Sequence, residues 1–145
     1  MKKSRVAFLG LFTAFAMILS FVESQIPTFV AIPGIKLGLP NIAIIIILYR
    51  FGWKEASIIS LLRVILTSLL FGTVLSMLYS IAGAVLSLVA MILLKKVLST
   101  VTISVIGGVC HNIGQILVAI LVTETQQLLY YLPVLIISGV IAGIV

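Results

Sequence analysis

The hydrophobic residues of this chain fall into six long runs, separated by short stretches that carry most of its charges, prolines and turn glycines. The runs cover residues 6–22, 37–51, 56–70, 73–94, 103–123 and 128–145. A helix needs about 20 apolar residues to cross a hydrocarbon core ~30 Å thick, and the second and third runs are the short ones. We therefore predict an all-α membrane protein, a single domain over residues 1–145 that forms a compact bundle of six transmembrane helices.

The composition is typical of a multi-pass protein of the cell membrane. Of the 145 residues, 63% are hydrophobic and 8% are charged, which leaves too few charges to cover the surface of a soluble domain. Nine lysines and arginines outnumber three glutamates, and the chain has no aspartate. The positions of the cations, and not their number alone, decide what this basic excess means.

The cations gather on one side of the predicted bundle. The residues on that side are Lys2, Lys3, Arg5, Arg50, Lys54, Lys95 and Lys96. Lys36 lies in a connector on the other side, so the positive-inside rule places both termini in the cytoplasm. Interpreting the first run as a signal peptide cleaved near Val22 and Ser24 would leave five spans and reverse this arrangement. Because the basic excess follows the membrane topology, we expect no nucleic-acid partner.

The first outer connector has unusual backbone chemistry. It reads "IPGIKLGLPN", residues 32–41. Pro33 and Pro40 restrict the backbone φ angle, whereas Gly34 and Gly38 permit positive φ. Such residues favour a folded loop, and Lys36 at its centre favours a lid or ligand-binding loop. A tight re-entry turn is the alternative. Asn41 is predicted to cap the second helix at its N-terminus.

Arg63 lies inside the third run, nine residues after Lys54, which corresponds to a depth of ~13 Å from the cytoplasmic boundary. An arginine near the midplane costs ~2.5 to 3.5 kcal/mol on insertion scales, so it usually faces a cavity, a partner or a ligand. Pairing with a helix carbonyl or a glutamate is the alternative. We expect no carboxylate at this depth, because Glu23 and Glu124 belong to the outer rim and Glu55 to the inner one. A negatively charged ligand would then supply the missing charge.

The fifth run contains a second polar group, "GGVCHNIGQ", residues 107–115. His111 and Gln115 are four residues apart and share one helical face, and Asn112 adjoins them. His111 is expected at about the depth of Arg63, so these residues can form one substrate-binding pocket. Interhelical hydrogen bonding is the alternative role for a histidine in a membrane helix.

Small residues form stripes on three of the predicted helices. The stripes are Ala7, Gly10 and Ala14 on the first, Ser76, Ser80, Gly83 and Ser87 on the fourth, and Gly139 and Gly143 on the sixth. Small residues let helices approach closely in lipid. Most stripes are expected to pack internally, and one can instead face a partner protein.

The sequence lacks the residues that several kinds of chemistry require. The single cysteine, Cys110, excludes a disulfide within the chain and is expected to be a packing residue. One histidine without a cysteine or acid partner does not make a zinc site, and no phosphate-binding loop for ATP is present. No nucleophile, base and acid form a set. We therefore predict no catalytic residues, no metal, no cofactor and no enzymatic activity.

Eight motifs in order resemble a known family over nearly the whole chain. They are "ESQIP", "PGIKLGLPN", "LYRFGWKEA", "LLRVILTSLLFG", "YSIAGAVLS", "LLKK", "HNIGQ" and "YYLPVLIISG". Together they resemble the Gx transporter family, whose members are often labelled heptaprenyl diphosphate synthase component I. That family is similar to the substrate-binding S components of energy-coupling factor (ECF) transporters, which have six helices with both termini inside.

The resemblance implies an uptake function. An outward-open pocket roofed by the first outer loop would capture a small, anionic and partly hydrophobic solute, for example an isoprenoid or quinone precursor. Lys36, Arg63, His111, Asn112 and Gln115 would bind it. The inner face would dock on a coupling membrane protein that carries two ATPases. S components commonly dock through an alanine-rich motif on the first helix, and the matching stripe here contains Gly10 and Ala14.

The label of the family gives the alternative function. Prenyl diphosphate synthases use aspartate-rich motifs, because clustered carboxylates hold the magnesium ions that neutralise pyrophosphate. This chain has no aspartate and is not expected to be that catalytic subunit. The alternative is therefore an accessory membrane subunit that associates with a prenyl diphosphate synthase.

Overall fold

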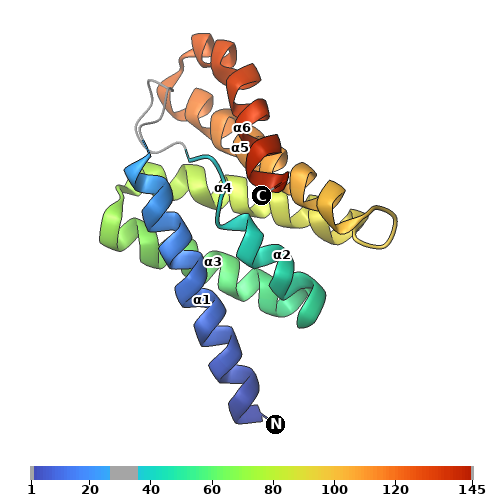
Figure 1. Ribbon diagram of the computed structural model, residues 1–145. Helices are drawn as coiled ribbons and strands as arrows, with labels where there is room; N and C mark the ends of the chain where they lie inside the picture. The colour runs from blue at the N-terminus through green and yellow to red at the C-terminus, as the bar shows by residue number, and fades with distance from the viewer. Residues whose placement is uncertain (1, 27–35, 145) are drawn as a thin grey trace.

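The computed structural model describes residues 2–26 and 36–144, and these residues form helices joined by short connectors (Figure 1). The α-helices are α1 (Lys2–Gln25), α2 (Asn41–Arg50), α3 (Trp53–Phe71), α4 (Val74–Leu94), α5 (Thr100–Thr123) and α6 (Leu132–Ile144). A 3-10 helix, η1 (Gln126–Tyr131), leads into α6. The all-helical class predicted from the sequence is confirmed for the described residues.

Four segments of the described chain are long and apolar enough to cross a membrane. They are Lys3–Gln25, Val74–Leu94, Thr100–Thr123 and Gln126–Ile144. The helix α2 has ten residues, and α3 carries Lys54, Glu55 and Arg63 within its 19 residues. The chain is thus a helical membrane protein, while six complete spans and cytoplasmic termini stay predictions.

The helix ends follow local chemistry. Thr73 and Ser76 form a reciprocal capping box at the start of α4, and the Ser99 side chain accepts a hydrogen bond from the Thr102 amide at the start of α5. Gly52, with a φ of 113°, lets the chain reverse between α2 and α3.

The predicted capping role of Asn41 is wrong. Pro40 occupies the N-cap position of α2, and the Asn41 side chain instead points into the bundle. There its Nδ2 donates to the Gly107 carbonyl oxygen over 3.5 Å. Asn41 therefore links α2 to α5 and does not cap its own helix.

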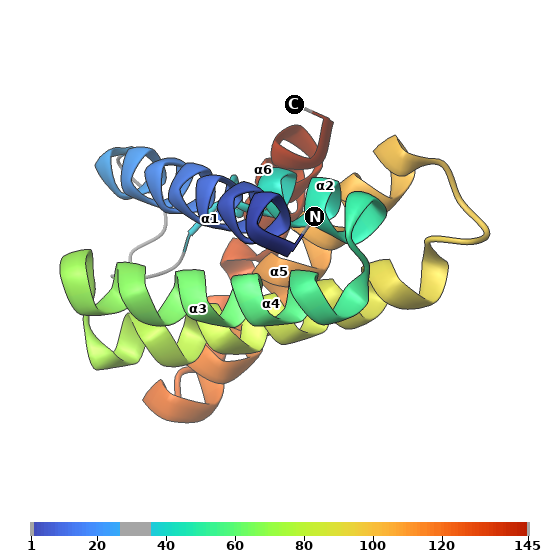
Figure 2. The same cartoon turned by 90° about the horizontal axis from the view of Figure 1, so that it is seen from below.

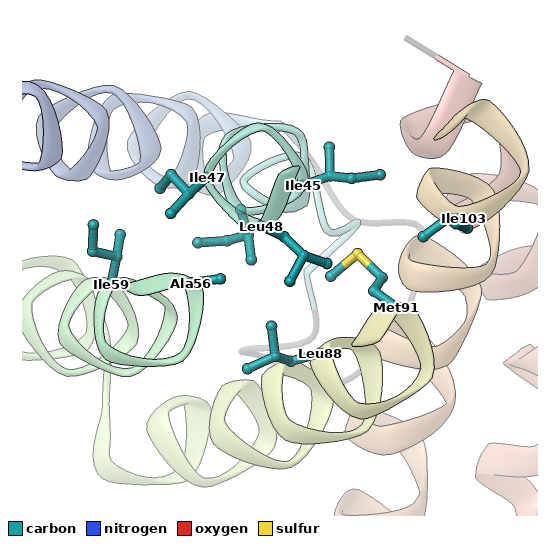
Figure 3. Close-up of a cluster of buried hydrophobic side chains, with 9 residues drawn as sticks. Ile45, Ile47, Leu48, Ala56, Ile59, Leu88, Met91 and Ile103 are labelled. Atoms are coloured by element: carbon teal, nitrogen blue, oxygen red, sulfur yellow. The ribbon is translucent and has the colours of Figure 1, made fainter. Parts of the chain in front are cut away.

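An apolar core joins α2 to its neighbours (Figure 3). Its buried side chains are Ile44, Ile45, Ile47, Leu48, Ala56, Ile59, Leu88, Met91 and Ile103, which come from α2, α3, α4 and α5. The short helix α2 is therefore held between the longer ones. A second core, centred on Tyr79 and Leu135, joins α4 and α5 to η1 and α6.

Glycines bring α5 and α6 into backbone contact. A methyl group on Gly139 of α6 would lie 2.8 Å from the carbonyl oxygen of Gly108 on α5. Such an approach excludes any side chain at either position. The stripe on α6 is thus internal packing, as is the stripe on α4, whose Gly83 lies against the backbone of His111.

The small residue at position 10 of α1 is not closely packed as the glycines of α4, α5 and α6 are. Helix α1 lies along one edge of the bundle, where it contacts α2 and α3 (Figure 2). A methyl group on Gly10 would meet no other helix of the described chain within 4 Å. The small residue at position 10 is therefore not required by packing within the described subunit.

We expect the same substitution to have opposite effects at these two glycines. Gly139→Ala should destabilise the fold by about 1–3 kcal/mol, because the rigid backbone of Gly108 must move away. Gly10→Ala should be neutral or stabilising by up to ~1 kcal/mol, because alanine has the better helix propensity. Thermal unfolding of the two variants in detergent measures the difference. Equal melting temperatures would contradict the packing described for α5 and α6.

Candidate functional site

Charged and polar side chains from separate parts of the chain meet inside the bundle. Ser20 and Glu23 come from α1, Arg63 from α3, and His111 and Gln115 from α5. None of these side chains is more than 2% exposed. Lys36 and Gly38 lie against these side chains. We call the five side chains, together with that of Lys36, the buried polar cluster.

Arg63 is the buried cation of the cluster. Its Nη1 donates to the Ser20 hydroxyl over 3.4 Å, whereas Nε and Nη2 have no hydrogen-bond partner among the described residues. In the part of the chain that the structure describes, the one ion pair joins Arg5 and Glu55 and does not involve Arg63. Arg63 is therefore buried, as the sequence predicts for a functional arginine, with most of its donors unused by the described chain.

Glu23 belongs to the same cluster, although the sequence predicts a place for it at the outer rim and away from Arg63. Its side chain is 2% exposed and interacts electrostatically with Arg63 and Lys36. The expected absence of a carboxylate near Arg63 is corrected by this placement. The reason is that α1 continues to Gln25, beyond the predicted end at residue 22. Ala16, Ser20 and Glu23 are then spaced four and three residues apart, so they share the buried face of α1.

The described end of the first connector is fastened to the cluster at two points. One Glu23 carboxylate oxygen accepts hydrogen bonds from the backbone amides of Gly38 and Leu39, the latter over 3.2 Å. The Lys36 amide donates to the Gln115 side-chain oxygen over 3.1 Å. Gly38 lies against the His111 ring, and its φ of 96° is a backbone conformation that residues with side chains rarely adopt. Pro33 and Gly34 lie outside the described residues.

The Lys36 side chain is a second cation beside Arg63. Burial lowers the pKa of its ammonium group. The Glu23 carboxylate opposes this shift in pKa, and the positive charge of Arg63 adds to it. With one carboxylate between two cations, the cluster carries an excess of positive charge while both cations are protonated.

The α5 residues divide between two faces. The His111 ring lies against Gly83 of α4, and its Nδ1 has no hydrogen-bond partner in residues 2–26 and 36–144. Gln115 uses its oxygen for the Lys36 amide, and its Nε2 finds no acceptor in the same ranges. Asn112 is turned by about 100° from His111 around the helix, and its Nδ2 donates to the Leu135 carbonyl over 2.6 Å. The structure thus brings His111 and Gln115 to the cluster and places Asn112 in the contact between α5 and α6.

The predicted docking residues Ala7, Gly10 and Ala14 are exposed along α1. Ala14 also borders an apolar groove of about 330 Å³ between α1 and the end of α3. Its other lining residues are Met17, Ile18, Phe21, Leu70 and Phe71. Within the described chain, the contacts of α1 with other helices do not account for these small residues.

The fold and the cluster define a helical membrane protein that encloses a charged group among apolar helices. Residues 12–145 match the model of a family described as heptaprenyl diphosphate synthase component I, and the chain belongs to that family. The family resemblance read from the sequence is thereby confirmed. No curated protein and no solved structure matches the chain. The similarity to ECF S components stays a prediction.

Proposed function

We propose that this protein is a solute-binding membrane subunit whose buried polar cluster holds a small anionic solute. The main support for this proposal comes from Arg63. Its guanidinium is fully buried, and two of its nitrogens have no hydrogen-bond partner in the described chain. A buried polar group without a partner costs roughly 1–3 kcal/mol, and more when it is charged. Protein interiors rarely keep such groups unless a ligand, water or ion satisfies them. An anion bound by Arg63 would remove this cost.

The neighbouring side chains support the same ligand class. The Nε2 of Gln115, which has no acceptor among the described residues, is a hydrogen-bond donor, and Lys36 adds positive charge. The guanidinium of arginine holds a carboxylate or phosphate through two parallel hydrogen bonds. The described end of the connector, which bonds to Glu23 and Gln115, lies beside these groups, so a bound solute would lie close to it. Closure of this connector over the solute stays a prediction.

For the protein as a whole we propose solute uptake as an S component of an ECF transporter. The exposed small residues of α1 and the adjoining apolar groove support a helix-docking face, which would meet the coupling membrane protein that carries two ATPases. The second candidate is an accessory membrane subunit of a prenyl diphosphate synthase. The description of the family favours this second candidate. In that role, the synthase would carry out the diphosphate chemistry, because this chain has no aspartate to hold magnesium.

Co-purification from the native membrane separates the two candidates. A coupling protein with ATPases supports uptake, whereas a soluble synthase rich in aspartate supports the accessory role. Solute binding at the cluster is compatible with either set of partners, because binding is measured separately on the purified subunit.

We expect Gly10→Leu to weaken partner assembly several-fold while leaving the isolated subunit folded. Position 10 has free space in the described subunit, so the leucine should fit there, but its side chain would hold a docking helix away. Val89→Phe, on an exposed face of α4, is the control and should assemble normally. Pull-down yield and melting temperature are the measurements. Normal assembly of Gly10→Leu would rule out this face of α1 as the docking site.

A further inference from the structure

A second hollow lies at the opposite end of α1 from Glu23, where α1 begins and α2 ends. Two adjoining cavities of about 480 Å³ and about 460 Å³ share the residues Phe8, Arg50 and Phe51. Arg5 borders the first cavity, while Phe12 and Ile46 border the second. Because they share three residues, the cavities form one groove between the two helices, which we call the α1–α2 groove.

The α1–α2 groove has one arginine available for an anion. Arg5 is paired with Glu55, and its guanidinium carbon lies 5.9 Å from the centre of the Phe51 ring. Arg50 is exposed and forms no ion pair within residues 2–26 and 36–144. The two arginines and Glu55 leave an excess of one positive charge. Arginine matches the geometry of phosphate oxygens better than lysine does, because it donates two parallel hydrogen bonds.

The apolar part of the α1–α2 groove lies deeper than the arginines. Phe12 follows Phe8 by one helical turn along α1, and Ile46 precedes Arg50 by one turn along α2. Figure 1 shows that α1 starts and α2 finishes toward the same end of the bundle. By their order along the two helices, Phe12 and Ile46 therefore lie farther from that end than Phe8 and Arg50 do. The arginines thus lie nearer the end of the bundle and the side chains of Phe12 and Ile46 farther from it, in the same order as the head and chain of a membrane amphiphile.

We propose that the α1–α2 groove binds an amphiphile with a phosphate head and an apolar chain. Arg50 holds the phosphate at the membrane surface, and Phe8, Phe12 and Ile46 contact the chain. This site is separate from the buried polar cluster and does not depend on the solute proposed for it. Two compounds share the required chemistry, a phospholipid of the bilayer and a prenyl diphosphate.

The test is native mass spectrometry of the detergent-purified protein with added dioleoyl phosphatidylglycerol or farnesyl diphosphate. Farnesol supplies the chain without the head, and inorganic pyrophosphate supplies the head without the chain. The variants are Arg50→Gln, which removes the phosphate contact, and Phe8→Ala, which removes the shared aromatic ring. Both side chains are exposed, so the fold should persist. Lys96→Gln is the matched control, because it removes one exposed cation outside the groove.

We expect the wild-type protein and Lys96→Gln to retain at least one amphiphile roughly tenfold more tightly than Arg50→Gln, as the loss of one charged hydrogen-bonding group predicts. Phe8→Ala should also weaken retention, and farnesol and pyrophosphate should bind poorly. Preference for phosphatidylglycerol would identify a lipid site, and preference for farnesyl diphosphate a prenyl diphosphate site. Equal retention by wild type and Arg50→Gln, binding of farnesol as tight as that of farnesyl diphosphate, or retention of neither amphiphile would overturn the proposal.

Discussion

Arg63→Gln should weaken binding of the native solute by at least about 3 kcal/mol, or roughly 100-fold, because the solute would lose its charged partner in a buried site. Arg63→Lys should weaken solute binding nearly as much, since a lysine ammonium does not offer two parallel donors in fixed geometry. Arg50→Gln removes the same charge at the other end of the bundle and should bind the solute normally. Equilibrium binding of the solute released from the wild-type protein measures all three variants.

The electrostatic interaction between Arg63 and Glu23 requires a stability control. Arg63→Gln leaves the Glu23 carboxylate buried without the favourable charge of Arg63, so the ligand-free variant should itself lose stability. The double variant Glu23→Gln/Arg63→Gln removes both charges and should recover much of that stability. It should not recover solute binding. A double variant that binds the solute as the wild type does would show that Arg63 only balances Glu23.

The second large effect is expected at Glu23. Glu23→Ala should destabilise the ligand-free protein by about 3–5 kcal/mol, because it leaves Arg63 uncompensated and removes the acceptor of the Gly38 and Leu39 amides. Glu23→Gln keeps one oxygen acceptor and should lose less. Glu55→Ala is the matched control: its ion pair with the half-exposed Arg5 is expected to contribute less than ~1 kcal/mol. Chemical or thermal unfolding in detergent gives the three differences.

A Glu23→Ala variant as stable as Glu55→Ala would contradict the anchoring of the first connector described above. The same variants report on the connector directly. Hydrogen exchange at the Gly38 and Leu39 amides should accelerate in Glu23→Ala, because both lose their acceptor. Exchange at the amides of α4 should change little.

The sequence predicts the helical class and several helix positions well, because hydrophobic length is the strongest signal in a membrane chain. The run 73–94 corresponds to Val74–Leu94. The sixth run predicts one helix, but the chain enters it through η1 before α6 begins at Leu132. Pro133 fits this boundary, because proline lacks an amide hydrogen and favours the first turn of a helix.

The composition of the buried polar cluster is only partly predictable from the sequence. Arg63, His111 and Gln115 stand out as polar residues inside apolar runs, and their depth along the helices predicts their proximity. Glu23 escapes this prediction because the first apolar run ends at residue 22, although the helical spacing of Ala16 and Ser20 continues to it. The prediction does not separate Asn112 from His111 and Gln115, because adjacency in sequence does not show the turn of about 100° between consecutive helical residues.

The most direct test of solute binding at the buried polar cluster is native mass spectrometry of the wild type and Arg63→Gln, purified in parallel from the same membranes. We expect the wild-type protein to retain a small anionic molecule that is released when the complex is activated in the spectrometer. Arg63→Gln and the double variant with Glu23→Gln should not retain it. Retention of that same molecule at equal occupancy by Arg63→Gln would contradict solute binding at the cluster.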